Sequence, residues 1–231
     1  MSLNPVSMTP APGLLSRDVE IDIEHAALLF VDVQNYNARP DGGEYSHLDP
    51  QEVAARYGEF FHAMMTRAVP NMQRLLAACR AAGIEVTHTV IESMTRDGRD
   101  RSLDYKISGF NVPRGSWDGQ VLDAIAPAED EMVFRKTSSS VFISTNIDYV
   151  YRNLGVRSLI VAGVLTDQCI DSAVRDACDL GYLVTTVTDA CATLTQERHD
   201  WSLRNNRGYS RQVTTDAMMA EIERLAKMVK R

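Results

Sequence analysis

The stretch SLIVAGVLTDQC at residues 158–169 decides the fold of this chain. Its first five residues form a short apolar run, which is typical of a strand buried on both faces of a parallel sheet. Residues 170–177, which follow, have the spacing of an amphipathic helix. The stretch therefore predicts a strand, a turn and a helix, with Cys169 on the first helical turn. Free backbone N–H groups and the positive end of the helix dipole lie there, and both favour a thiolate, the nucleophilic form of cysteine.

The other three cysteines fit an ordinary packing role. Unpaired cysteine is among the most buried residue types, and packing is an alternative for Cys169 as well. Cys79 and Cys178 fall inside predicted helices, and Cys191 follows a predicted strand. The place of Cys169 at a strand-to-helix turn favours an activated thiol instead. Because the four cysteines lack the paired spacing of a disulfide framework, we expect a reducing, cytoplasmic location.

Strands and helices alternate along the rest of the chain. We expect strands at residues 26–32, 85–91, 131–134, 158–162, 182–187 and 211–213. We expect helices at residues 50–82 with a break at Pro70, 145–155, 167–180, 195–206 and from 215 onward. The polar residues 92–113 form a long excursion of the functional or disordered kind. This order predicts an α/β fold in three layers, a mostly parallel sheet with helices on both faces.

Composition limits the classes of function. The chain has 231 residues, 45% of them hydrophobic, and a formal net charge of −7. That length suits one domain, expected over residues 18–231 after a flexible arm at residues 1–17. The acidic balance and the absence of a dense Lys/Arg tract predict no binding to nucleic acid. We expect no membrane span and no secretion signal, because the sequence has neither a run of about 18 apolar residues nor a basic-then-apolar start.

Three reactive side chains follow three different predicted strands. Asp32 ends the strand at 26–32, Lys136 follows the strand at 131–134, and Cys169 follows the strand at 158–162. Taken singly, the acid is also typical of a cap and the lysine of a solvated surface. Because the carboxyl ends of parallel strands meet at one edge of a sheet, we expect the three to converge. An acid can accept the thiol proton, and an ammonium group stabilises the thiolate that remains.

These motifs resemble those of the isochorismatase-like cysteine hydrolase superfamily, which includes several small-molecule amidases. The matching segments are FVDVQN at 30–35, Lys136 with SSSVF at 138–142, GVLTDQC at 163–169, RDA at 175–177, GY at 181–182 and DAC at 189–191. The likeness extends over almost the whole chain after Ile23. Each motif is short, but their order and strand context together make the resemblance specific.

The resemblance implies a six-stranded sheet of order 3-2-1-4-5-6 and an Asp32–Lys136–Cys169 triad. In such a triad Asp32 is the general base and acid, Lys136 orients and polarises, and Cys169 attacks an amide or ureide carbonyl. The resemblance further implies a cis peptide bond before Leu165, whose N–H would join that of Cys169 in an oxyanion hole. The implied enzyme is an amidohydrolase that forms a thioester, releases ammonia or an amine, and assembles as a homo-oligomer.

Departures from the family pattern bear on the substrate. Tyr36 and Asn37 stand where many members have Asp-Phe, which argues against a nicotinamide-sized aromatic substrate. Within the amidase branch, the preferred substrate is a small linear N-carbamoyl or ureidoacrylate-type compound. Gln34, Asn35 and Asn37 are candidate amide-recognition residues, and Tyr36 is a candidate wall of the substrate pocket. Arg96, in the excursion after the second strand, could bind a substrate carboxylate, although a solvated loop or subunit contact is the alternative.

The sequence predicts neither a metal nor another cofactor. The nicotinamidase branch binds a metal through Asp-x-His and a further His, whereas here Asp49 is followed by Pro50 and Gln51, with His47 before it. A lone loop histidine is not a converging set of ligands. Two other functions stay open: an isochorismatase-type ether hydrolase, which Cys169 disfavours, and a catalytically silent scaffold, which the intact triad disfavours.

Overall fold

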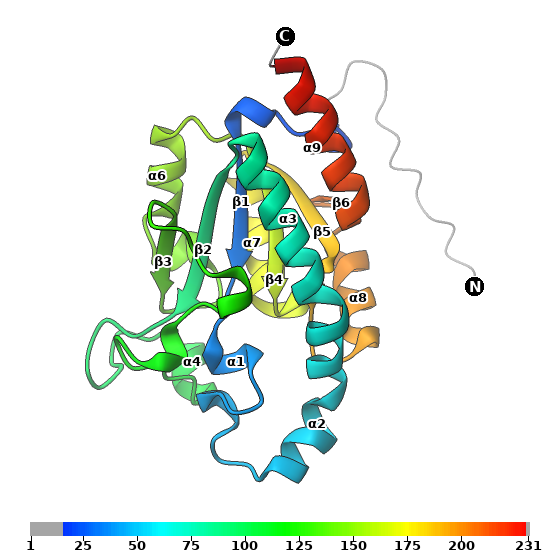
Figure 1. Cartoon of the computed structure of the whole chain (residues 1–231). Coiled ribbons are helices and arrows are strands. Elements are labelled where there is room, and N and C mark those ends of the chain that lie inside the picture. Colours follow the sequence, from blue (N-terminus) through cyan, green and yellow to red (C-terminus); the bar gives the residue numbers. More distant parts are fainter. Residues whose placement is uncertain (1–15, 230–231) are drawn as a thin grey trace, which may run out of the picture.

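The computed structural model describes residues 16–229, and six of their segments form one parallel sheet (Figure 1). Residues 1–15, which make up most of the expected arm, lie outside the described residues. The sheet order is β3-β2-β1-β4-β5-β6, which confirms the expected order 3-2-1-4-5-6. The strands are β1 Ala26–Val31, β2 Glu85–Ile91, β3 Met132–Lys136, β4 Ser158–Val164, β5 Leu183–Ala192 and β6 Arg211–Val213.

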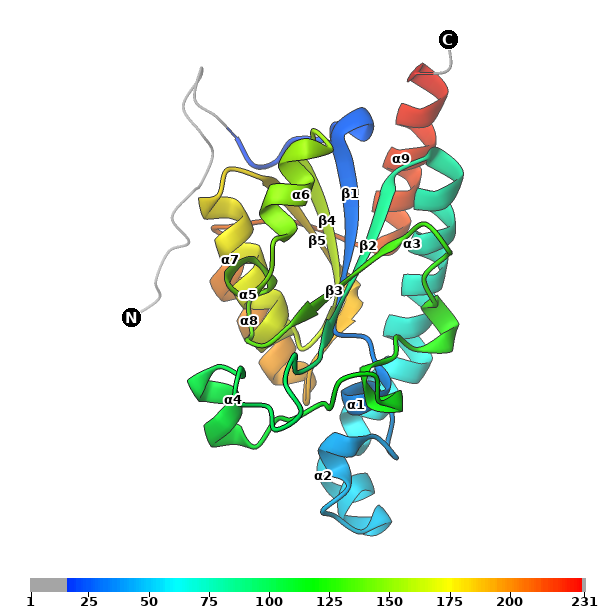
Figure 2. The ribbon, with the colours of Figure 1, turned by 90° about the vertical axis from the view of Figure 1, so that its left-hand side faces the viewer.

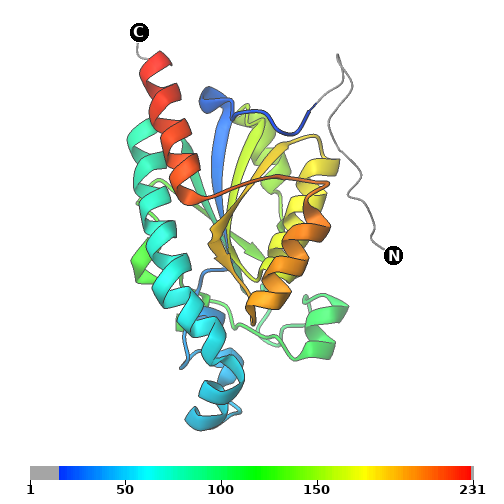
Figure 3. The same cartoon turned by 90° about the vertical axis from the view of Figure 1, so that its right-hand side faces the viewer.

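Helices cover both faces of the sheet. The α-helices are α1 Asn35–Ala38, α2 Pro50–Ala63, α3 Val69–Ala82, α4 Leu103–Ser108, α5 Val141–Ser144, α6 Ile147–Asn153, α7 Asp171–Asp179, α8 Gln196–Asn206 and α9 Thr215–Val229. Short 3-10 turns lie at Ile23–His25, Gly43–Tyr45, Trp117–Gly119 and Asp123–Ile125, and π-helical turns at Met64–Ala68 and Thr166–Ile170. Figures 2 and 3 show α3 and α9 on one side of the sheet and α5, α6 and α7 on the other.

Strand alternation divides the core into two layers. Leu28 and Phe30 of β1 belong to the core under α2, α3 and α9, whereas Leu29 and Val31 belong to the core under α5, α6 and α7. Successive side chains of a strand point to opposite faces, so a strand that is buried throughout must be apolar on both. Every residue of β1 and β4 is buried. The three-layer α/β prediction is therefore confirmed.

The long helical region before β2 is continuous, so the break expected at Pro70 is wrong. A π-helical turn, Met64–Ala68, joins α2 to α3, and the Val69 N–H bonds to the carbonyl of Met64. Proline in a regular α-helix lacks an N–H and presses on the carbonyl four residues earlier, here that of Thr66. The wider π turn accommodates Pro70 at the first turn of α3, and the chain stays helical.

Other elements near the carboxyl ends of the strands also differ from the sequence prediction. β3 ends on Lys136 instead of before it, and β5 continues to Ala192, which places Cys191 inside the strand. The excursion at residues 92–113 contains α4, capped by the Ser102 side chain and ended by Gly109 in the left-handed conformation. Figures 1 and 2 show α4 beyond the carboxyl ends of the strands.

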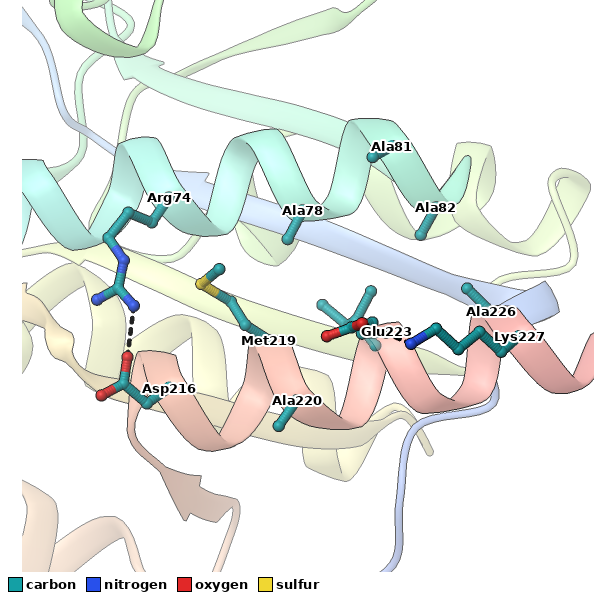
Figure 4. Close-up of a pocket in the computed structure, with 11 residues that line it drawn as sticks. Arg74, Ala78, Ala81, Ala82, Asp216, Met219, Ala220, Glu223, Ala226 and Lys227 are labelled. Carbon is teal, nitrogen blue, oxygen red and sulfur yellow. Dashed lines mark hydrogen bonds and ion pairs between the residues drawn. The ribbon is translucent and has the colours of Figure 1, made fainter.

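A shallow groove lies between α3 and α9 on the outer surface (Figure 4). Alanines of both helices line it, and an Arg74–Asp216 ion pair closes one end at 2.5 Å. The groove shares no residue with the predicted triad.

No helix among residues 16–229 is long and apolar enough to cross a membrane.

Candidate active site

The predicted nucleophile lies directly beyond the carboxyl end of β4. The peptide bond between Val164 and Leu165 is cis, and the π-helical turn Thr166–Ile170, which contains Cys169, begins after it. Cys169 is 6% exposed. π-helical turns are rare and frequently occur at functional sites. The sulfur is thus placed at the sheet edge where sites of parallel α/β folds are found.

Asp32 follows β1 and is held by the neighbouring strand. Its backbone has a φ of 53°, in the left-handed region that aspartate tolerates better than most residues. The Asp32 N–H donates to the Thr89 carbonyl at 3.1 Å and to its Oγ1 at 3.2 Å. Thr89 Oγ1 in turn donates to Asp32 Oδ1 at 2.8 Å. One side chain on β2 therefore fixes both the backbone and the carboxylate of Asp32.

Lys136 contacts both the acid and the thiol. Its Nζ lies 2.8 Å from Asp32 Oδ2 and donates to the Ser138 carbonyl at 2.7 Å and to Cys169 Sγ at 3.3 Å. The Asp32 contact is a fully buried ion pair. Asp32 and Lys136 are fully buried. The structure thus brings all three predicted residues together.

Close packing of β1 against β4 makes this convergence possible. Gly163 of β4 has a φ of 128°, and a Cβ at this position would lie 2.2 Å from the Val31 carbonyl oxygen. Only glycine fits so near another backbone. Because Val31 immediately precedes Asp32, the same close approach brings the ends of β1 and β4 together.

Burial and charge set the resting protonation of the site. Burial alone would lower the pKa of Lys136, but the charges of Asp32 and Cys169 outweigh it and raise that pKa, so the lysine stays cationic. Burial raises the pKa of Cys169 to about 12, Lys136 opposes this rise, and the charge of Asp32 adds to it. Desolvation thus opposes the thiolate that the helix terminus favours, and Lys136 supports it.

A fourth side chain that sequence reasoning missed reaches this cluster. Tyr105 of α4 is 1% exposed, and its hydroxyl accepts a hydrogen bond from Lys136 Nζ at 2.8 Å. The same oxygen lies 3.8 Å from Cys169 Sγ. A single aromatic residue in a polar segment carries no periodic pattern. Thr89 was missed for a related reason, because only strand register places it beside Asp32.

The polar residues after Asp32 are mostly used by the fold. Gln34 donates from Nε2 to the carbonyls of Ile91 and Asp118 at 3.0 Å each, and its Oε1 accepts the Ile91 N–H at 2.6 Å. Asn35 donates to the Trp117 carbonyl at 3.0 Å. Both side chains anchor loops at the strand ends, and their roles in substrate binding stay predictions.

The remaining candidates for substrate contact differ in environment. Tyr36 is buried and packs edge-on against Phe110, with ring centroids 6.1 Å apart, in the same apolar cluster as Tyr105. Asn37 is 6% exposed, and its Oδ1 has no hydrogen-bond partner within residues 16–229. Arg96 is exposed, whereas the triad is buried. Asn37 is thus the candidate that keeps an unused buried acceptor.

The carboxylate considered for a metal site has a structural role. Asp49 caps α2 by accepting the N–H groups of Gln51 and Glu52 at 2.8 and 2.9 Å, and Glu52 accepts the Asp49 N–H in return. His47 is exposed. Among the described residues, no group of three or more His, Cys, Asp and Glu side chains is arranged to hold a metal ion.

Comparisons with known proteins agree with this geometry. Ureidoacrylate amidohydrolase RutB of Rhizobium rhizogenes is 28% identical over 180 residues, covering 71% of this chain and 69% of that protein. A cysteine hydrolase structure from Pseudomonas syringae matches with a TM-score of 0.74 and 24% identity, covering 89% of this chain and 95% of that one. N-carbamoylsarcosine amidase from Thermoplasma acidophilum matches with a TM-score of 0.62 and 22% identity, covering 83% and 96%. At these identities the two structures show the fold alone.

The isochorismatase domain model matches residues 26–218, most of the chain, and the protein therefore belongs to the isochorismatase family of hydrolases.

Proposed function

We propose that this protein is a cysteine amidohydrolase that cleaves a C–N bond of a small linear amide or ureide. The observation that carries the proposal is the buried contact of Lys136 with both Asp32 and Cys169, at 2.8 and 3.3 Å. A structural thiol needs neither an acid nor an ammonium group beside it. An ether hydrolase has no use for a thiol so placed, and a silent scaffold has no reason to bury a charge pair.

The first half of the proposed reaction forms a thioester. Asp32 takes the thiol proton on its carboxylate. The sulfur attacks the carbonyl carbon, and Lys136 balances the negative charge in the site. In this proposal the oxyanion accepts hydrogen bonds from the N–H groups of Leu165 and Cys169. The C–N bond then breaks, and Asp32 returns the proton to the departing nitrogen.

The second half releases the acid. Asp32, again a carboxylate, takes a proton from water, and the resulting hydroxide attacks the thioester carbonyl. The C–S bond breaks, and the thiolate of Cys169 recovers the proton from Asp32. Each turnover consumes one water molecule and yields a carboxylic or carbamic acid and ammonia or an amine, and the enzyme returns to its starting state.

The substrate class rests on weaker support than the reaction type. The relative from Rhizobium rhizogenes acts on ureidoacrylate, as its name states, and the Thermoplasma structure is that of an N-carbamoylsarcosine amidase. Asn37 keeps a buried acceptor oxygen, which suits a substrate rich in N–H groups. We propose an N-carbamoyl or ureidoacrylate-type compound on these grounds.

Ammonia release from a panel of small amides tests the proposal. The panel comprises ureidoacrylate, N-carbamoyl amino acids, biuret, maleamate and nicotinamide. Cys169→Ala should abolish turnover of whichever compound is hydrolysed. Cys79→Ala is the matched control, because Cys79 is also buried and its pKa is also raised by burial, but it lies in α3. Full activity in the Cys169→Ala protein, or equal losses in both variants, would contradict the mechanism.

Assembly and compartment are further parts of the proposal. We propose a homo-oligomer, which light scattering of the purified protein would test, and a monomer at micromolar concentration would refute it. Of the free thiols, Cys79, Cys169 and Cys191 are buried. Unpaired thiols of this kind suit a reducing compartment such as the cytoplasm, which fractionation of cells that express the protein would test.

A further inference from the structure

Tyr105 is the anchor by which α4 is attached to the rest of the protein. Its ring packs against Phe110 at 5.4 Å between centroids, within a small apolar cluster that also holds Ile91 and Val112. The other apolar residues of α4, Leu103 and Ile107, are 73% and 77% exposed. The one residue that α4 buries is therefore the one that reaches the triad.

The hydrogen bonds around the Tyr105 hydroxyl have a defined direction. Lys136 has only protons to give, so the Tyr105 oxygen is the acceptor in their 2.8 Å contact. The phenol proton is then left to donate, and Cys169 Sγ at 3.8 Å is within reach of it. Burial, followed by the charges of Cys169 and Asp32, raises the pKa of Tyr105, so the phenol keeps its proton.

We propose that Tyr105 is a positioning residue whose hydroxyl holds the Lys136 ammonium and donates a hydrogen bond to the Cys169 sulfur once that sulfur is deprotonated. The inference rests on the proposed function. The proton of Cys169 passes to Asp32, and Tyr105 keeps its own proton throughout. A neutral thiol is a weak acceptor, whereas a thiolate accepts a charge-assisted hydrogen bond. The hydroxyl therefore stabilises the product of the deprotonation more than its starting state.

Because Tyr105 lies on α4, its hydrogen bond to Cys169 depends on the position of that helix. The phenol reaches the sulfur only while α4 is seated over the strand ends, as in Figure 2. The reactive form of the sulfur is thus favoured by the position that α4 has in this structure. A simple steric role is the competing explanation, in which the ring covers the thiol and the hydroxyl does nothing.

Tyr105→Phe separates the two explanations, because it removes the hydroxyl and keeps the ring against Phe110. The measurement is the rate of Cys169 alkylation by iodoacetamide, followed by mass spectrometry of the Cys169 peptide. We expect a rate about tenfold lower than that of the unmodified protein, the usual effect of a hydrogen bond to a charged group. Tyr151→Phe is the matched control. It removes another buried phenol hydroxyl, which is bonded to Thr87, and should leave the rate unchanged.

Hydrogen exchange of the α4 amides shows whether access to the thiol has changed. Slower alkylation with unchanged exchange supports the proposal, and Tyr105→His, which restores a donor on a ring, should recover part of the rate. Alkylation of Tyr105→Phe as fast as that of the unmodified protein would overturn it. The proposal would also be overturned if the slower alkylation of Cys169 were matched by an equal fall in hydrogen exchange of the α4 amides. Alkylation needs no substrate, so the proposal is decided even if no compound of the panel is hydrolysed.

Discussion

His88 offers a sharp test of how burial shapes this protein, because it is an ionisable side chain in the middle of β2. It is 1% exposed and stacks on Phe30 with centroids 5.4 Å apart. Neither ring nitrogen has a hydrogen-bond partner in the part of the chain that the structure describes, since Glu131 Oε2 lies 3.6 Å from Nε2, too far for a hydrogen bond. Burial lowers the pKa of His88 from 6.5 to about 4, while Glu131 opposes the shift and Arg80 adds to it.

The sign and size of the effect on stability follow from this shift. Above pH 6.5 the ring is neutral in both states and contributes no pH dependence. Between pH 6.5 and about 4 the unfolded chain binds a proton that the folded protein does not, so the folded state loses stability as pH falls. The complete loss is about 3 kcal/mol, and most of it has accumulated by about pH 4.5.

Urea denaturation of the wild type and of His88→Leu, at about pH 7.5 and about pH 4.5, measures this contribution. Other groups titrate alike in the two proteins, so the difference between their losses isolates His88. We expect the wild type to lose about 2–3 kcal/mol more than His88→Leu. His47→Leu is the control, since His47 is exposed and should behave as the wild type. Equal losses in the wild type and in His88→Leu would refute the reasoning.

Two further substitutions test the architecture of the site. Thr89→Val removes the hydroxyl that holds Asp32, and we expect kcat to fall at least about tenfold, with stability lower by about 1–3 kcal/mol. Thr87→Val, on the same strand, should lower stability similarly but keep kcat, and a Thr89→Val enzyme of normal kcat would contradict the assigned role. Gly163→Ala should cost about 2–5 kcal/mol in thermal or urea unfolding, because strain and a backbone clash add at this position. Gly83→Ala, with a φ of 73° and nothing near the added Cβ, should cost only about 1 kcal/mol, and equal losses would show that the clash is relieved.

The sequence was sufficient to predict the sheet and the triad because both depend on local patterns. Short apolar runs mark the buried strands, and the sheet order followed from the family resemblance. Asp32, Lys136 and Cys169 were found because each lies at the end of such a run. The parallel topology then requires these ends to meet, without any knowledge of side-chain contacts.

What the sequence did not predict depends on contacts between distant segments. The rise that burial causes in the pKa of Cys169 was not predicted, because desolvation depends on the assembled core, whereas the helix terminus is evident from the local sequence. Tyr105 lies in a segment with no periodic pattern, and its hydroxyl meets Lys136 only in the folded protein. Pro70 predicted a break because a π turn has no simple sequence signature.

The π turn at Met64–Ala68 also sets the rotational phase between α2 and α3. It holds one residue more than a regular turn, so the buried faces of the two helices are related by an angle that a plain α-helix of the same length would not give. Phe60 on one side of the turn and Met72 on the other are both fully buried in the same core. Loss of one residue here would rotate α2 by about 100° relative to α3 and turn Phe60 away from that core. The length of this helical region is therefore as constrained as its composition, although most of its surface faces water.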